Sequence, residues 1–302
     1  MLRTSYYDLI NGYKEMFLLK EEPNQQDDQF IEGTTFEDIV ELYQLDRRIR
    51  HTLLEALLDV EAVFYSSVAY SIAEAYGEKQ IDYLKKENYK IGRKQWKSQR
   101  FERDNLLDKI NRKLNKPEVE PLIYYKKKYG NIPPWILVKD LSFGELVMLY
   151  KLSGNRVKTD VIRHIIGEVP TEEDKEFFLK CVELFNKFRN WAAHGGRMYN
   201  HRTRIELPYL DKVHQLVQIS KEEYTTGTGK NDFAAVVLGM IYFYQKDPLD
   251  ALEFFINLNT IMEEYQKKKP LEYEQVLAEL GLPPNYYKVI LEKYMYKRNP
   301  ST

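Results

Sequence analysis

Residues 35–77 have the sequence TFEDIVELYQLDRRIRHTLLEALLDVEAVFYSSVAYSIAEAYG, and this stretch decides the fold class. Its apolar residues recur every three or four positions, which is the spacing of one face of an α-helix. Gly77 supplies a stop signal, so we expect one helix from about Thr35 to about Tyr76. Over such a length, a break near Asp46 is also consistent with the pattern.

Three charged residues fall on the apolar stripe of this helix, namely Arg47, Arg50 and Glu61. Charged groups are costly to bury unless they are paired. Arg50 and Glu61 are three turns, or about 16 Å, apart and cannot pair with each other. We therefore hypothesise that Glu61 binds a basic group of another helix, with Arg189 as the candidate. The alternative is a helix break that exposes Glu61, and the sequence does not separate the two.

The rest of the chain is also rich in helical patterns. Periodic apolar residues predict further helices at about 102–115, 141–152, 160–166, 171–193, 232–245, 248–268 and 273–280, with weaker ones at 6–19 and 210–220. No stretch shows the strict alternation of a half-buried strand, so the fold class is all-α. We expect a single helical domain over residues 1–302, with a core at about 35–220, a C-terminal helical extension at about 231–302, and a polar, basic insertion at 78–101.

The composition is that of an ordinary globular protein, with 43% hydrophobic and 30% charged residues. No run of 18 apolar residues is present, and the start of the chain lacks the apolar segment of a signal peptide. The single cysteine, Cys181, excludes a disulfide framework within one chain. We therefore expect a cytoplasmic protein with no membrane segment.

The net charge of -1 gives no sign of a nucleic-acid partner, but two local clusters are basic. Residues 85–103 are rich in Lys and Arg around Trp96, and Lys126–Lys128 lie among tyrosines. Basic groups neutralise phosphates and aromatic rings stack on bases. Taken alone, each cluster is better explained as solvated surface.

The segment FRNWAAHGGRMYNHR, residues 188–202, carries the candidate chemistry at the end of an amphipathic helix. Its polar residues suit a phosphodiester reaction, because imidazole can move a proton near neutral pH and guanidinium can hold phosphate oxygens. RNA supplies its own nucleophile, the 2′-OH. The residues concerned are Arg189, Asn190, His194, Arg197, Asn200, His201 and Arg202.

The spacing of Arg189 and His194 limits what one chain can do. Five residues on a straight helix turn through about 500°, so the two side chains point roughly 140° apart. Either the helix unwinds near Gly195 and Gly196, or two copies of the motif meet across a symmetric dimer. A third interpretation is an ordinary helix end whose polar residues form caps and surface pairs, since R-x4-H alone is a short pattern.

Other site types lack their motifs. The sequence contains no H-E-x-x-H, no three-ligand cluster and no glycine-rich phosphate loop, so we expect neither a metal nor a cofactor. His201 is a lesser catalytic candidate than His194.

Several stretches together resemble the Abi-like abortive-infection proteins, which carry a HEPN domain. RNWAAHGGRMYN at 189–200 is similar to their R-N-x-x-A-H-x-x-R-[LM]-[YW]-N motif. Further similarities, in chain order, are YYDLINGYK at 6–14, LYQLDRRIRHTLLEALLDVE at 42–61, IPPWILVKDLSFGELVMLY at 132–150 and LGLPPNYYKV at 280–289. The Gly195–Gly196 pair departs from the pattern, in which larger residues follow the histidine, and we expect it to add flexibility.

The resemblance implies a HEPN-type helical bundle and a metal-independent RNA endonuclease in antiphage defence or as a toxin. It implies a homodimer with a composite site in which Arg189 and His194 act and Asn190 supports them. Arg47, Arg50 and Glu61 are the expected supporting residues, and Arg197, Asn200, His201 and Arg202 the expected RNA-binding residues. Some relatives are restrained by a small RNA, so a small non-coding RNA antitoxin or guide is an expected partner.

Two main functions thus follow from the sequence, beside a third interpretation as a helical dimerisation module for another protein with no RNA role. The first is cleavage of RNA by attack of the 2′-OH on the adjacent phosphate. The alternative is a non-catalytic RNA-binding HEPN protein that serves as a scaffold or is held by a small RNA. Cleavage products separate the two.

Overall fold

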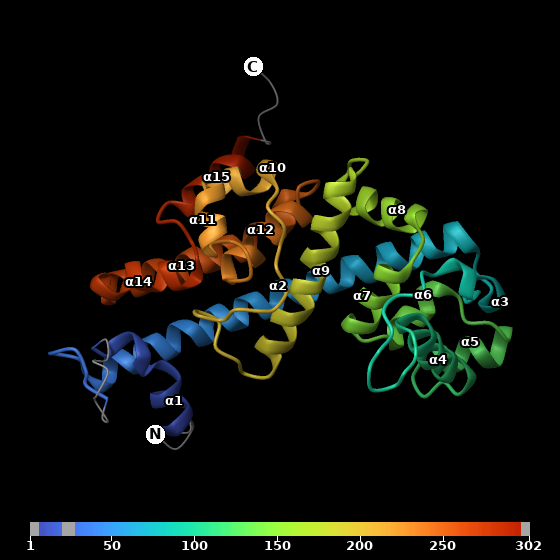
Figure 1. Ribbon diagram of the computed structural model, residues 1–302, viewed down its shortest axis with the longest axis horizontal. Helices are drawn as coiled ribbons and strands as arrows, with labels where there is room; N and C mark the ends of the chain where they lie inside the picture. The colour runs from blue at the N-terminus through green and yellow to red at the C-terminus, as the bar shows by residue number, and fades with distance from the viewer. Residues whose placement is uncertain (1–5, 20–27, 297–302) are drawn as a thin grey trace.

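The computed structural model describes residues 6–19 and 28–296, and this part of the chain is helical with three isolated β-bridges and no sheet (Figure 1). The prediction of an all-α fold is confirmed. The α-helices are α1 (Tyr6–Tyr13), α2 (Phe36–Tyr76), α3 (Gln80–Tyr83), α4 (Glu102–Asn115), α5 (Leu122–Tyr129), α6 (Pro134–Leu137), α7 (Phe143–Leu152), α8 (Asn155–Ile166), α9 (Glu172–Ala193), α10 (Asp211–His214), α11 (Lys221–Thr226), α12 (Phe233–Phe243), α13 (Leu252–Lys268), α14 (Pro270–Leu280) and α15 (Tyr286–Tyr296). Short 3-10 helices are η1 (Lys14–Phe17), η2 (Lys86–Asn88), η3 (Val138–Asp140), η4 (Gln215–Val217) and η5 (Pro248–Ala251).

The central element is α2, a continuous helix of 41 residues with no break near Asp46. Thr35 and Asp38 form a capping box at its start, which satisfies backbone N–H groups that a helix leaves unpaired there. The chain leaves the helix at Gly77, whose φ of 88° is unfavourable for other residues. The predicted start and stop are therefore confirmed.

The other helices pack along α2 (Figure 1). α1 lies near its beginning, α3 and α6 pack near its end, and α8, α9 and α13 pack along its length. α9 crosses α2 near the middle of the molecule, and the apolar α12 packs against α9. Apart from Leu9, the buried apolar side chains form one cluster that extends from Tyr13 to Ile290.

By length and composition, α2 is the one helix in the described ranges that could cross a membrane. Half of its most apolar 18-residue window is buried inside the fold. A core helix of a water-soluble protein has the same properties.

Some helices differ from the prediction. α8 begins at Asn155, whereas the predicted helix began near 160. Apolar periodicity did not reveal the first turn, because Val157 is its single buried apolar residue. α11 was not among the predicted helices, yet Ser220 and Glu223 form a capping box that begins this six-residue helix. Such a helix is too short for apolar periodicity to reveal it. Residues 297–302 of the predicted C-terminal extension lie outside the described residues.

Candidate active site at the end of helix α9

The capping box at the start of α9 fixes one end of the helix that carries the candidate motif. The Thr171 side chain accepts from the backbone of Asp174, and the Asp174 carboxylate accepts from Thr171 N at 3.0 Å. Lys212 Nζ lies 2.6 Å from Asp174 Oδ1. Burial alone would raise the pKa of the Asp174 carboxyl, but hydrogen bonds from Lys212 and Thr171 lower it below its usual value.

Along its length, α9 buries an apolar face against α2, α7 and α12. The buried side chains are Phe177, Phe178, Cys181, Val182, Leu184, Phe185, Phe188 and Ala192. Because this packing sets the rotation of the helix, Arg189 lies at the edge of the buried face, beside α2.

Arg189 forms the ion pair with Glu61 that the sequence suggested. Arg189 Nε donates a hydrogen bond to Glu61 Oε2 at 3.2 Å. Glu61 is 9% exposed and α2 is continuous, so the alternative of a helix break that exposes Glu61 is wrong. The contact uses Nε, and the terminal Nη1 lies 3.4 Å from Asn190 Oδ1.

Tyr65 holds the other oxygen of the same carboxylate. Its hydroxyl lies 3.1 Å from Glu61 Oε1 and also contacts the backbone carbonyl of Leu141. Burial, and then the neighbouring Glu61 carboxylate, raise the pKa of Tyr65 above its usual value, so the hydroxyl stays protonated. Glu61 is thus fixed between Tyr65 and Arg189.

The end of α9 has the hydrogen bonds of a Schellman motif. Gly195 N donates to Ala192 O at 3.1 Å, and Gly196 N donates to Trp191 O at 2.9 Å. Gly195 has a φ of 78°, and a Cβ on Gly196 would lie 2.2 Å from the Trp191 ring. Gly195 thus has a conformation that favours glycine, and Gly196 leaves no room for a side chain beside Trp191. The pair forms a hydrogen-bonded turn, and its expected flexibility stays a prediction.

Arg50 and Asp46 of α2 hold the chain beyond this turn. Arg50 Nη1 donates to the carbonyls of Gly195 at 3.2 Å and Gly196 at 3.4 Å. It also lies 3.7 Å from Asp46 Oδ2. The buried Arg50 thus has partners that compensate for its desolvation.

Asp46 is fully buried and accepts from three further donors. Its Oδ1 accepts from Met198 N at 2.7 Å and from Tyr199 N at 2.8 Å, and its Oδ2 accepts from the Tyr13 hydroxyl at 2.8 Å. Burial raises the pKa of Asp46 above its usual value, although each of these donors favours the carboxylate. Asp46 therefore fastens α1 and the segment after α9 to α2.

His194 is the C-cap residue of α9, and its side chain is exposed. Its backbone N–H donates to Asn190 O at 3.1 Å. In the part of the chain that the structure describes, its imidazole has no side-chain partner and does not contact Arg189. Asn190 instead bonds to Asn186 Oδ1 at 3.3 Å. One chain thus brings Arg189 and Asn190 together and leaves His194 apart from them.

The four predicted RNA-binding residues lie in different surroundings. Arg197 donates to the carbonyl of Gly12, which ties α1 to this segment. His201 stacks on Trp191 with ring centroids 4.6 Å apart, and burial together with Arg202 lowers its pKa below the usual value. Asn200 is half-buried, and Arg202 is exposed with Nη1 bonded to the carbonyl of His201.

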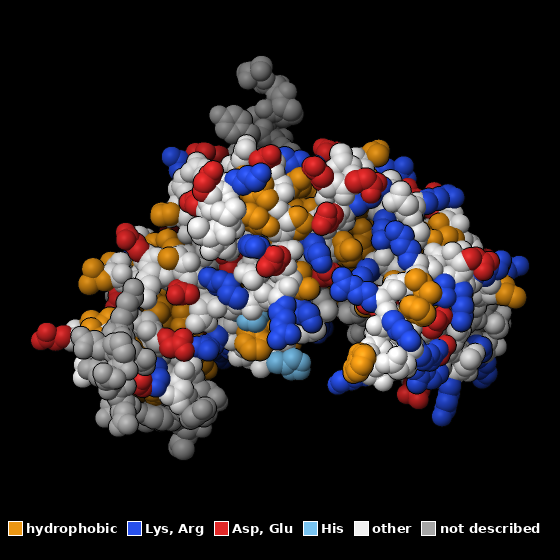
Figure 2. Space-filling model, in the orientation of Figure 1, with side chains coloured by type: hydrophobic (Ala, Val, Ile, Leu, Met, Phe, Trp, Pro, Cys, Tyr) orange, Lys and Arg blue, Asp and Glu red, His pale blue; other side chains and the backbone are white. Residues whose placement is uncertain are grey.

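Histidine side chains and basic side chains gather on the surface over the C-terminal end of α9 (Figure 2). A hollow in the molecular surface lies next to them. This face therefore combines proton-transfer groups and positive charge in the open.

The comparison with family models gives one match, to the Abi-like protein model over residues 1–200. The match spans about two thirds of the chain and reaches the end of the candidate motif. The chain belongs to the Abi-like protein family. Neither the curated proteins nor the solved structures give a match to it. Membership of this family points to a role in abortive infection.

The matched part of this Abi-like protein contains Glu61, Arg189 and their partners Tyr65 and Asn190, as well as the turn after α9. Helices α10 to α15 lie beyond it. The resemblance of the tail at 280–289 therefore stays a prediction.

One supporting residue differs from the expectation. Arg47 was placed on the apolar stripe of α2, but its side chain is exposed. The buried face runs through Asp46, Ile49 and Arg50, and Arg47 is turned about 100° from Asp46. Among the described residues, Arg47 makes no contact that would let it support the site as predicted.

Sequence reasoning gave no role to three residues that this Abi-like protein uses to build the site, Asp46, Tyr65 and Trp191, although Asp46 was part of the resemblance to the family's long helix. Asp46 could have been found, because it lies four residues before Arg50 and two such residues share a helix face. Tyr65 stands in the same relation to Glu61. The packing of Trp191 on Gly196 has no signal in the spacing.

No group of three or more His, Cys, Asp or Glu side chains that could hold a metal ion occurs within residues 6–19 and 28–296. The expectation that the chemistry needs no metal remains a prediction.

Proposed function

We propose that this Abi-like protein is a metal-independent RNA endonuclease of the HEPN type that acts in abortive infection or as a toxin. Its site is composite and combines Arg189 and His194 from each of two copies. The observation that carries the proposal is the contrast between the two groups: a guanidinium that a buried carboxylate binds, and an exposed imidazole at the helix end that has no side-chain partner among the described residues.

The chemistry follows from the groups available. His194 takes the proton from the 2′-OH, or gives one to the leaving 5′-oxygen. The 2′-oxygen bonds to phosphorus as the bond to the 5′-oxygen breaks, which leaves a 2′,3′-cyclic phosphate and a 5′-hydroxyl. Arg189 stabilises the negative charge on the phosphate oxygens in the transition state. Glu61 keeps Nε engaged and Nη1 contacts Asn190, so Nη2 and the second hydrogen of Nη1 remain for the phosphate.

A second copy of the chain would bring together the Arg189 and His194 groups that lie apart in one chain. The side chains of Arg189 and His194 do not meet in one chain, and a two-fold contact would bring two motifs face to face. The exposed apolar side chain of Leu58 supports such a contact, since it is 47% exposed and lies one helical turn before Glu61 on α2. Burial of this side chain would favour association.

The remaining predicted residues have supporting roles. Asn190 orients the Arg189 guanidinium through its side-chain oxygen. Arg202 and Asn200 are the groups near the motif that would contact RNA phosphates or sugars. His201 and Arg197 act mainly by holding Trp191 and α1 in place.

The test uses purified protein, 5′- and 3′-labelled single-stranded RNA, and EDTA. Wild type should cut and leave cyclic-phosphate ends, whereas Arg189→Ala and His194→Ala should each lose nearly all cleavage. Glu183→Gln, on the same helix but outside the motif, is the matched control and should cut normally. Metal-dependent cutting, or unchanged cutting by His194→Ala, would exclude this mechanism. Tight RNA binding without products would instead assign a non-catalytic RNA-binding role, in which a small non-coding RNA should copurify.

A further inference from the structure

The loop at residues 90–101, between η2 and α4, exposes a tryptophan far from the candidate site in sequence. Trp96 is 88% exposed, whereas Trp135 and Trp191 are each less than half exposed. An isolated exposed aromatic residue has no meaning by itself. The shape, the charge and the position of this loop together indicate that the exposed Trp96 binds a ligand.

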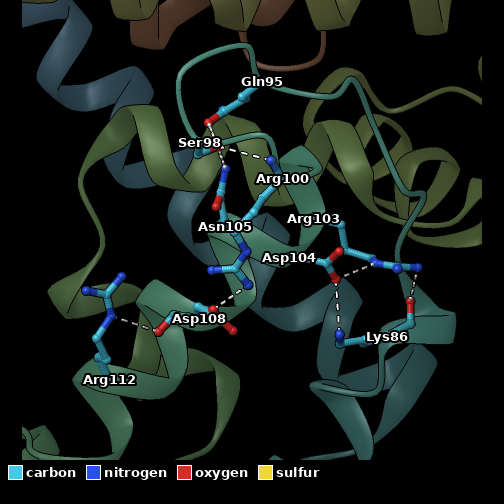
Figure 3. Close-up of polar contacts among 9 residues, drawn as sticks. All are labelled: Lys86, Gln95, Ser98, Arg100, Arg103, Asp104, Asn105, Asp108 and Arg112. Carbon is cyan, nitrogen blue, oxygen red and sulfur yellow. Dashed lines mark hydrogen bonds and ion pairs between the residues drawn. The ribbon is translucent and has the colours of Figure 1, made fainter.

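Hydrogen bonds from α4 hold the loop in shape (Figure 3). Asn105 Nδ2 donates to Gln95 Oε1 at 2.7 Å and to Ser98 Oγ at 2.9 Å. These two acceptors flank Trp96, so Asn105 fixes both sides of the turn that presents the indole ring.

The backbone of the loop is also closed on itself. Gln95 N donates to Arg100 O at 2.8 Å, and Gln99 N donates to Gln95 O at 2.8 Å. Gln99 has a φ of 54°, a conformation that costs a residue with a side chain about 1 kcal/mol or more. Its Nε2 donates to Trp96 O at 2.8 Å. An ordered loop loses little entropy when it binds a ligand.

The charges of the loop divide into two groups. At its base, Asp104 pairs with Lys86 and Arg103, and Asp108 pairs with Arg100 (Figure 3). The loop itself, at 90–101, contains no acidic residue. The exposed side chains of Arg93, Lys94 and Lys97 have no ion-pair partner in the described residues. The positive charge around the tryptophan is therefore left for an external anion.

The position of the loop links it to the candidate site. In Figure 1 the loop lies on the side of the α4 lobe that faces the C-terminal end of α9. Figure 2 shows a hollow between these two parts, with basic side chains on both sides of it. An extended, negatively charged chain could lie across the hollow and contact both.

We propose that the loop at 90–101 is a binding site for single-stranded RNA, in which Trp96 stacks on an unpaired base and Arg93, Lys94 and Lys97 bind the adjacent phosphates. The inference rests on the proposed function for the identity of the ligand. It assigns the loop to substrate binding and leaves the chemical step to the residues at the end of α9.

The experiment measures binding separately from cleavage. The probe is a fluorescein-labelled, single-stranded 2′-O-methyl RNA, which lacks the attacking hydroxyl, and binding is followed by anisotropy. Trp96→Ala should weaken binding about 5- to 100-fold, the loss expected for one base–aromatic stack. Trp96→Phe should bind nearly as wild type, and Leu271→Ala, which removes another exposed apolar side chain, should bind as wild type. The triple variant Arg93→Gln, Lys94→Gln, Lys97→Gln should reduce the slope of log Kd against log salt by about 2.

With cleavable RNA, Trp96→Ala should raise KM and leave the single-turnover rate at saturating RNA unchanged. Wild-type binding by Trp96→Ala would overturn the proposal. A dimer contact by Trp96 would also overturn the proposal. In that case light scattering would show Trp96→Ala to be monomeric, and RNA affinity would recover at protein concentrations that restore the dimer. Trp96-dependent binding without cleavage by any variant would refute the nuclease and keep this site. Cleavage that does not depend on Trp96 would keep the nuclease and refute this binding site.

Discussion

The pair formed by Glu61 and Arg189 allows a quantitative test of how the site is held. The Glu61 side chain is 12% exposed and that of Arg189 is 32% exposed. A hydrogen bond between charged groups contributes about 1.5–3 kcal/mol when it is shielded, and exposed pairs contribute about 0–1 kcal/mol. Because water screens the Arg189 end, we expect a coupling of about 1–2 kcal/mol between the two side chains.

A double-mutant cycle measures this coupling. The free energy of unfolding is determined by urea titration for wild type, Glu61→Ala, Arg189→Ala and the double variant, at one protein concentration because a dimer unfolds in a concentration-dependent way. A cycle on Arg48 and Glu264 is the matched control. Their side chains are 46% and 50% exposed, so this ion pair should show no measurable coupling.

The same variants link the ion pair to activity. Glu61→Ala leaves Arg189 in the chain but unfixed, and such misplacement should lower the single-turnover cleavage rate about 10- to 100-fold. Glu61→Gln retains an acceptor and should lose less. A coupling near zero, or wild-type cleavage by folded Glu61→Ala, would refute the view that Glu61 positions Arg189.

Three further predictions concern the surroundings of the site. Gly196→Ala should destabilise the protein by about 2–3 kcal/mol, because its Cβ would overlap the Trp191 ring. Gly195→Ala should lose only about 1 kcal/mol from backbone strain, and equal losses in urea titration would contradict this. Asp46→Asn turns an amide N–H₂ toward donors and should lose about 2–3 kcal/mol and most cleavage, so unchanged melting would argue against its role as a fastener. The lowered pKa of Asp174 means that its contribution is present above its unfolded pKa of about 3.9 and disappears as pH falls through the lower folded value; the difference in Tm between wild type and Asp174→Asn should therefore shrink below pH 4, and a constant difference would exclude this linkage.

The sequence was informative where a local pattern determines the structure. The helix starts predicted near residues 35, 141 and 171 are all present, because the side chains of Thr35, Ser142 and Thr171 satisfy the backbone groups that each helix start leaves unpaired. The contact between Glu61 and Arg189 could be predicted because a charge on a buried face needs a partner.

The sequence was uninformative where contacts depend on how distant segments pack. The fastening of Tyr13 and Met198 by Asp46 joins three separate segments, and no spacing reveals it. The packing of the Trp191 ring against Gly196, which shapes the cap after His194, likewise has no signal in the sequence. The position of His194 relative to Arg189 likewise depends on that cap.

Subunit mixing tests the composite site most directly. Wild-type protein is combined with an excess of the Arg189→Ala/His194→Ala double variant carrying a different tag, and pull-down verifies that hybrids form. If the site needs the motifs of both copies, cleavage should follow the square of the wild-type fraction, so that one wild-type chain in four gives about one sixteenth of the full activity. Cleavage in direct proportion to the wild-type fraction would show that each chain acts alone and would contradict the account.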